Sequence, residues 1–309
     1  MGLVNATLAQ APRIGASKSH LPSPASHRVK PSALQPLIAV RRGLVTPENS
    51  EDVAGYSWDM QNQPPTRKQV KKAGSRIRAY HRGDLPRHDY ELALRVVEQY
   101  RACFSSPTVN VNNWLRRYAR DAGLPVKVSQ RLKKVPTIIE KLTARETTLN
   151  LLTMHDIGGC RVVLDDLKSL RLFEASIKDH RQNQILRVLD YVEIPRISGY
   201  RAVHIVLKTQ PSGLPVEVQL RTQSMHEWAE TSEGFSKDLG RNFKQDGDHP
   251  VQEFLAVVAD IYFLTDMKKP ISHDLQKRYS ETLSEARRSI YVLRAAQGVQ
   301  QELPLDERI

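Results

Sequence analysis

The chain has 309 residues, of which 46 are Lys or Arg and 34 are Asp or Glu, so its formal net charge is +12. Its mean hydropathy of −0.47 and the lack of an 18-residue apolar run exclude a membrane-spanning helix. Two cysteines, Cys103 and Cys160, are too few for a disulfide framework and indicate a reducing compartment, which we expect to be the cytoplasm.

The positive charge is unevenly distributed along the chain. Residues 1–47 carry +6, residues 48–60 carry −4, residues 61–154 carry +12 and residues 155–309 carry −2. The first of these segments is rich in Ala, Ser and Pro and has no sustained apolar period, which predicts disorder. Translation from Met60 and an organelle transit peptide are alternative interpretations. The basic body predicts a polyanionic partner, such as a nucleic acid or nucleotide phosphates.

Apolar periodicity and turn residues predict the following elements in chain order. Helices are expected at 67–80, 89–103 and 109–122, a strand at 126–132, and a helix at 136–146. A strand at 157–164 and a helix at 166–180 follow, and then strands at 185–192, 202–208 and 216–220. The last two strands should form a hairpin, because a Pro211-Ser212-Gly213 turn joins them. Helices complete the chain at 224–239, 250–267 and 274–296.

Strands in the middle of the chain with helices on both sides predict an α/β (α+β) fold with a mixed sheet. We expect three parts: a disordered leader at 1–60, a central domain at 61–240 that includes the N-terminal helices, and a C-terminal helical extension at 241–309.

The chain lacks both GxxxxGK[ST] and GxGxxG, so any bound phosphate would depend on side-chain cations. Arg131 and Lys133 alternate on one face of a predicted strand, and Lys141 lies on the next helix. These three cations could converge on one polyphosphate. A solvated basic edge is the alternative interpretation.

Asp156 begins the segment DIGGCR, which leads into a buried strand. An aspartate at such a place is costly unless it binds a cation or caps a backbone group. Two glycines follow it and allow close backbone approach, and Arg161 comes next. The pattern predicts a Mg²⁺ ligand beside a phosphate-binding arginine. A purely structural pair between Asp156 and Arg161 is the alternative.

Two further motifs carry polar side chains on strands. Tyr200, in SGYRAVH, could stack on a nucleotide base, although a tyrosine at the start of a strand often only fills the sheet. Glu217, Gln219 and Arg221 share one strand face because side chains alternate. The helix that begins with the segment 225–230 could close over that face.

Together these segments resemble the synthetase domain of the RelA/SpoT alarmone enzymes. Over roughly residues 110–240, the matching pieces are the RxKK…Lys segment at 131–141, DIGGCR at 156–161, SGYRAVH at 198–204, EVQLRT at 217–222 and MHEWAE at 225–230. The resemblance implies a nucleotidyltransferase-like fold. It also implies transfer of pyrophosphate from ATP to the ribose 3′-hydroxyl of GDP or GTP, giving (p)ppGpp.

The resemblance also implies a role for individual residues. ATP phosphates would be held by Arg131, Lys133, Lys141 and Arg161. Asp156 would bind Mg²⁺, and Glu217 would position the metal or take the hydroxyl proton. Tyr200 would stack on the acceptor base, and the acceptor side would be lined by His204, Gln219 and Arg221.

The acceptor itself stays open at this point. After Glu230 the chain reads TSEGFSK, where the family usually has a histidine and an aromatic-Lys pair. One alternative is a toxin-like relative that transfers pyrophosphate to the 3′ end of tRNA, with an antitoxin or a second copy as partner. Candidate tRNA phosphate contacts are Arg76, Arg78, Arg82, Arg116, Arg117 and Arg120. A second alternative is a nucleic-acid-binding module without catalysis, against which the presence of both Asp156 and Glu217 argues.

Overall fold

The computed structural model describes residues 63–180, 184–240, 242–243 and 248–296. The predicted leader at 1–60 lies outside these residues. Among the helices that are described, none is long and apolar enough to cross a membrane.

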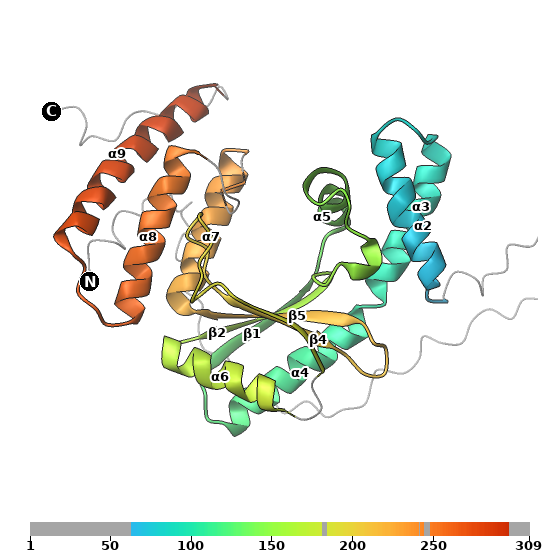
Figure 1. Cartoon of the computed structure of the whole chain (residues 1–309), viewed down its shortest axis with the longest axis horizontal. Helices are drawn as coiled ribbons and strands as arrows, with labels where there is room; N and C mark the ends of the chain where they lie inside the picture. Colours follow the sequence, from blue (N-terminus) through green and yellow to red (C-terminus); the bar gives the residue numbers. More distant parts are fainter. Residues whose placement is uncertain (1–62, 181–183, 241, 244–247, 297–309) are drawn as a thin grey trace, which may run out of the picture. The chain divides into compact units, whose positions relative to one another are not determined.

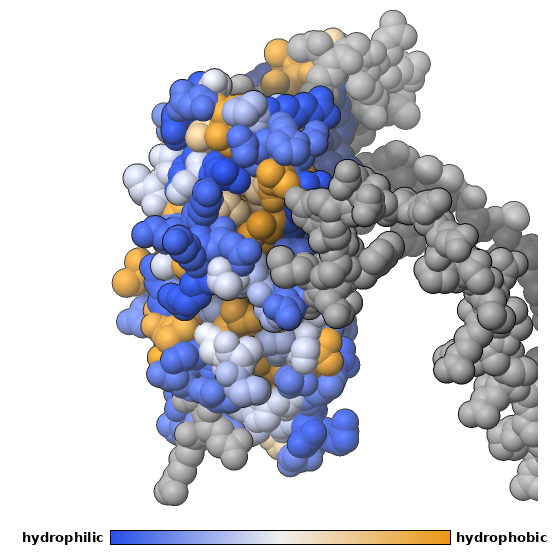
Figure 2. Space-filling view, turned by 90° about the vertical axis from the view of Figure 1, so that its right-hand side faces the viewer, coloured by the Kyte–Doolittle hydropathy of each residue, from blue (hydrophilic) through white to orange (hydrophobic). Residues whose placement is uncertain are grey.

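Three helices precede the sheet, as the apolar periodicity predicted. α2 (Arg67–His81) begins after Thr66, whose side chain forms a capping box with Gln69. α3 spans Arg87–Ala102, and α4 spans Ser105–Asp121. Figure 2 shows that the side of the molecule with α2 and α3 is predominantly hydrophilic.

Five strands form one mixed sheet in the order β1-β2-β5-β4-β3. Their limits are Val126–Leu132 for β1, Gly158–Leu164 for β2, Gln184–Asp190 for β3, Val203–Lys208 for β4 and Pro215–Thr222 for β5. The central pair, β2 and β5, runs parallel, and the other three pairs are antiparallel. The predicted hairpin of β4 and β5 and the mixed α/β architecture are therefore confirmed.

The two faces of the sheet differ because alternate residues of a strand point to opposite sides. Helices α4 and α6 (Leu167–Asp179) cover one face of the sheet (Figure 1). Apolar side chains on that face, such as Val162 and Val218, form a core with residues of both helices. We call the other side the polar face, defined by Arg131, Arg161, His204, Glu217, Gln219 and Arg221. The register places these six residues on one side of the sheet.

A second apolar core joins α2 and α3 to the segment that follows β1. Val70 and Ile77 of α2 belong to it together with Val97 of α3, and so do Ile138 and Leu142. All five are almost fully buried. This core fixes the segment that carries Lys141.

The helix predicted over 136–146 is in fact two pieces. α5 spans Val135–Glu140, and a π-helical turn, η2, covers Lys141–Arg145. In this turn the backbone N–H of Glu146 donates to the carbonyl of Lys141, five residues back. A hydrophobic pattern with helical period does not reveal such a change in hydrogen bonding, and π-turns are frequent at functional sites.

Three helices follow the sheet within one residue of the predicted limits: α7 (Gln223–Asp238), α8 (Pro250–Asp266) and α9 (His273–Ala296). α8 packs against both of the others. Trp228 of α7 donates its indole N–H to the carbonyl of Leu255 on α8 at 2.6 Å. The predicted boundary at residue 240 stays a prediction.

Candidate active site on the polar face of the sheet

Asp156 lies just before β2 and accepts hydrogen bonds from two lysines. Its Oδ2 is 2.7 Å from Nζ of Lys133 and 3.2 Å from Nζ of Lys141. The backbone N–H of Lys133 donates to the carbonyl of Ile157 at 2.8 Å, which holds the first lysine beside the carboxylate. The structure therefore joins the two motifs that the sequence presented separately. The alternative Asp156–Arg161 pair is wrong, because the carboxylate binds lysines instead.

These contacts decide the protonation state of Asp156. Burial acts to raise its pKa, but the charges and hydrogen bonds of Lys133 and Lys141 outweigh burial, so the pKa lies below its ordinary value. Asp156 is thus an anion at neutral pH. If another cation bound this carboxylate, the ammonium groups of Lys133 and Lys141 would be free to bind phosphate oxygens.

Glu217, on β5, is the second carboxylate of the polar face. Its Oε1 accepts from Nδ1 of His204 at 2.9 Å, and its Oε2 accepts from Nε2 of Gln219 at 2.8 Å. Burial acts to raise the pKa of Glu217, but the partners His204 and Gln219 lower it below its ordinary value. Glu217 lies opposite Gly159, three residues beyond Asp156, so the two carboxylates lie at the same end of β2 and β5. The negative charge of Asp156 acts to raise the pKa of Glu217.

The hydrogen bonds continue from Glu217 to the far end of β5. The second ring nitrogen of His204, Nε2, lies 2.7 Å from the hydroxyl of Tyr200. Arg221 donates to the same hydroxyl at 2.9 Å. His204 therefore joins the carboxylate of Glu217 to the hydroxyl of Tyr200 through its two ring nitrogens. These hydrogen bonds join the side chains of four residues in one row, which we call the acceptor chain: Glu217, His204, Tyr200 and Arg221.

Tyr200 is only 7% exposed. Its ring packs edge-on against Tyr191 and His204 and is tilted toward Trp228. A base could stack on this ring only after one of these neighbours moved, so the stacking role stays a prediction. Tyr191 is less buried and has the guanidinium of Arg196 4.8 Å above its ring. No pattern in the sequence singles out Tyr191, because it falls inside the strand predicted at 185–192.

Arginines form the cationic part of the polar face. Burial lowers the pKa of Arg161, and the positive charges of Arg221 and Arg131 lower it further, with Glu233 acting in the opposite direction. Nε of Arg161 and both Nε and Nη1 of Arg221 are buried without a hydrogen-bond partner within the described part of the chain. Buried donors that lack partners are costly, so this cluster suits a bound anion.

His226, in the first turns of α7, borders the same cluster. Burial lowers its pKa, and Arg161 and Arg221 act in the same direction against Glu230. Its Nε2 lies 3.3 Å from Oε1 of Glu230. The sequence indicated that this helix could close over the site, but it gave no role to His226 itself.

The donor set can be compared with the needs of Mg²⁺. Across residues 63–180, 184–240, 242–243 and 248–296, no group of three or more His, Cys, Asp and Glu side chains forms a metal cluster. Mg²⁺ commonly binds through one or two carboxylates and completes its shell with phosphate oxygens and water. Asp156 and Glu217 fit a magnesium ion that arrives with a nucleotide, and do not form a site that would hold one alone.

Two carboxylates and several cations lie at the polar face of a mixed sheet, and side chains of these kinds suit phosphate oxygens and Mg²⁺ as ligands. Residues 130–239 match the family described as the region found in RelA/SpoT proteins.

Part of the chain is similar to curated proteins and to solved structures. The chain is 32% identical to the bifunctional (p)ppGpp synthase/hydrolase SpoT of Escherichia coli K12 over 111 residues, which are 36% of this chain and 15% of that protein. It is 27% identical to the GTP pyrophosphokinase YwaC of Bacillus subtilis 168 over 109 residues, which are 32% of this chain and 52% of YwaC. Small alarmone synthetase 1 of Bacillus subtilis, solved with its product pppGpp, aligns with a TM-score of 0.45 and 22% identity, over 55% of this chain and 90% of that one.

The chain thus spans at most about half of the length of these curated relatives.

Proposed function

We propose that this chain is a pyrophosphokinase, which transfers the terminal diphosphate of ATP to the ribose 3′-hydroxyl of GDP or GTP. The observation that carries the proposal is the convergence of Asp156 and Glu217 with basic side chains from separate elements. The RelA/SpoT region and the similarity to a protein named GTP pyrophosphokinase support the same activity.

On the donor side, Lys133 and Lys141 would bind phosphate oxygens of ATP, and Arg131 and Arg161 would add positive charge. Transfer at phosphorus depends mainly on positioning and on cations that neutralise developing negative charge. Asp156 and Glu217 would hold Mg²⁺, which supplies further neutralisation of phosphate charge when bound. The lysines reach the site from the segment after β1 and from η2, so two rigidly packed elements determine their spacing.

On the acceptor side, the 3′-oxygen forms a bond to the β-phosphorus of ATP. The bond from that phosphorus to the α–β bridging oxygen breaks, and AMP leaves. We assign the hydroxyl proton to Glu217. Because the pKa of Glu217 is below its ordinary value, it is a weak base and its main contribution is to orient the hydroxyl. His204 and Gln219 hold the carboxylate for this task.

The experiment is to incubate the full chain with γ-labelled ATP and, separately, GDP, GTP, ATP and deacylated tRNA, and to resolve the products. We expect label in a guanosine tetra- or pentaphosphate. Glu217→Gln and Asp156→Asn should each lower this transfer by about a hundredfold or more. The matched control is Glu98→Gln, an exposed residue of α3 outside the site. Wild-type protein that labels no guanine nucleotide would overturn the proposal.

The same experiment tests the tRNA alternative, for which the structure changes the candidate residues. Four of the six arginines have partners within the fold: Arg76 pairs with Asp89, Arg78 donates to the carbonyl of Leu149, Arg82 pairs with Asp84, and Arg116 donates to the carbonyl of Val128. Of the six, Arg117 and Arg120 on α4 remain, and α2 adds the exposed cations Arg67, Lys68, Lys71 and Lys72. Label on tRNA alone would favour this alternative.

A further inference from the structure

Helix α8 holds the loop that leads into the acceptor chain, although α8 lies beyond the residues that match the RelA/SpoT family. The link is Arg201, which is 9% exposed. Arg201 donates from Nη2 to Oδ1 of Asp260 on α8 at 2.9 Å, and from Nη1 to the carbonyl of Val192 at 3.1 Å. Its guanidinium also lies 4.2 Å from the ring centre of Phe263 on α8.

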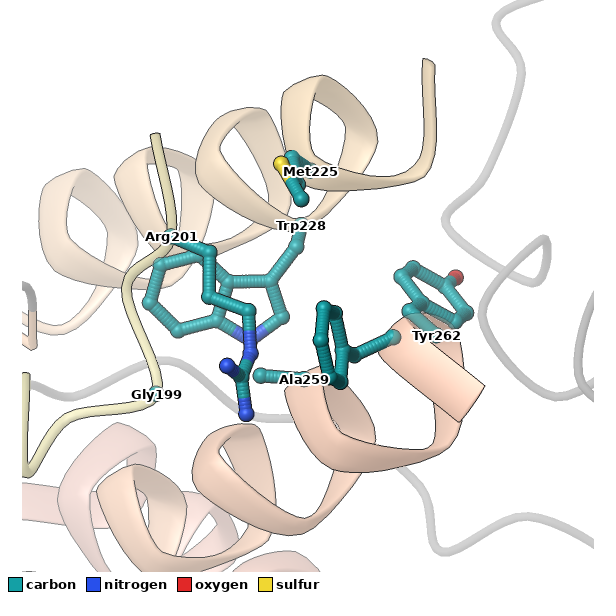
Figure 3. Close-up of a pocket in the computed structure, with 7 residues that line it drawn as sticks. Gly199, Arg201, Met225, Trp228, Ala259 and Tyr262 are labelled. Carbon is teal, nitrogen blue, oxygen red and sulfur yellow. The ribbon is translucent and has the colours of Figure 1, made fainter. Parts of the chain in front are cut away.

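The contact between this loop and α8 is close at the backbone level. Gly199 has a φ of +85°, and a Cβ there would lie 2.8 Å from both Cα of Ala256 and Cβ of Ala259. Neither the conformation nor the space would accept a side chain. Figure 3 shows Gly199 and Arg201 beside Ala259, where they line a small pocket between α7 and α8. The residue fixed in this way directly precedes Tyr200.

α8 is attached to the other end of the acceptor chain as well. Oδ2 of Asp266, the last residue of α8, accepts from the hydroxyls of Thr222 and Ser224, each at 2.6 Å. Thr222 directly follows Arg221, which donates to Tyr200. Helix α8 therefore contacts residues that are adjacent in sequence to both Tyr200 and Arg221, two members of the acceptor chain.

We propose that α8 is a positioning element for the acceptor half of the site, and that Asp260 acts through Arg201 as a positioning residue. This inference rests on the proposed function. A buried guanidinium needs an anionic partner, and Asp260 provides it. Without that carboxylate, Arg201 is held less firmly, and Tyr200 and Tyr191 lose a fixed support. The donor lysines are carried by other elements, so their binding of ATP should be unaffected.

The test compares Asp260→Asn with the wild type, with Asp260→Glu as the conservative variant and with Glu253→Gln as an exposed control on the same helix. We expect Asp260→Asn to raise the acceptor KM about tenfold, with little change in the KM for ATP or in Tm. Asp260→Glu should restore most of the loss. An unchanged acceptor KM, or an equal rise of both KM values, would overturn the inference.

Hydrogen exchange separates this inference from the proposed function. Backbone amides of residues 191–202 should exchange faster in Asp260→Asn than in wild type, and at the wild-type rate in Glu253→Gln. This readout needs no reaction. If wild-type protein transfers nothing but the loop loosens in Asp260→Asn, the proposed function fails and the positioning by α8 stands. Unchanged exchange in this loop would overturn the positioning role itself.

Discussion

Gly159 on β2 lies directly across from Glu217 on β5 in the parallel register. Because Gly159 has no side chain, nothing on β2 stands beside the carboxylate at this position. Its neighbour Gly158 faces the opposite side, where a Cβ would lie 2.4 Å from Oγ1 of the buried Thr108. The two adjacent glycines thus serve different purposes. Gly159 leaves space beside the carboxylate of Glu217, and Gly158 allows close packing against α4.

The first prediction separates these two reasons. Gly158→Ala should destabilise the fold by about 1–3 kcal/mol, because the added methyl overpacks against α4. At Gly159 a Cβ meets only the carbonyl of Glu217 at 3.6 Å, an ordinary contact. Gly159→Leu should therefore keep the Tm within a few degrees but lose transfer activity. Thermal unfolding and the labelled-ATP assay check both; equal loss of Tm in the two variants would contradict the distinction.

The second prediction concerns acid. The pKa of Asp156 is lowered in the folded protein, so it contributes stability above its unfolded pKa of about 3.9 and loses it as pH falls through the folded value. Asp156→Asn should be less stable than wild type at pH 7, because it leaves Lys133 and Lys141 without their shared anion. The difference should shrink below about pH 4. Urea unfolding across pH 3–8 measures it, and a pH-independent difference would contradict the electrostatic origin.

The third prediction tests the acceptor chain. Tyr200→Phe keeps the ring but removes the hydroxyl that joins His204 to Arg221. Both partners lose a buried hydrogen bond, so we expect a loss of about 1–2 kcal/mol in stability. The kcat/KM for the acceptor should fall about tenfold, because His204, which holds the carboxylate of Glu217, loses its hydrogen bond to Tyr200. Arg187→Lys, at an exposed position of β3, serves as a control, and unchanged kinetics in Tyr200→Phe would contradict this role.

The fourth prediction concerns the two thiols. Burial raises the pKa of Cys160 to about 12, and this residue is 2% exposed in the core. Cys103 is only partly buried. Iodoacetamide at pH 8 should therefore modify Cys103 well before Cys160, and Cys160 should react only on unfolding. Peptide mass spectrometry after timed quenching checks the order. Equal rates in native protein would show that the core at β2 opens readily.

Much of the fold was accessible from local patterns. β1 has the predicted limits, 126–132, because a turn and Pro125 set one end and Pro136 follows the other closely. The hairpin of β4 and β5 followed from its turn. The break after Glu140 was not predictable, since the change from α to π hydrogen bonding leaves the apolar spacing intact.

The residues that share the polar face were partly predictable, but their contacts were less so. Alternation correctly placed Glu217, Gln219 and Arg221 on one face. The sequence did not show that Asp156 pairs with lysines, because that contact depends on how the segment after β1 meets the start of β2. It also could not show the burial of Tyr200, which results from rings brought together by distant segments.

The division of the sheet into an apolar and a polar face has a consequence for mutational tolerance. A slip of β5 by one residue against its neighbours would turn Val218 toward water and Glu217 toward the helices. Loss of catalytic alignment would then coincide with loss of the core. Selection for a stable sheet should therefore also preserve the positions of the side chains on the polar face. Changes that shift specificity should accumulate in the loop before β4 and in α8 instead of in the central strands.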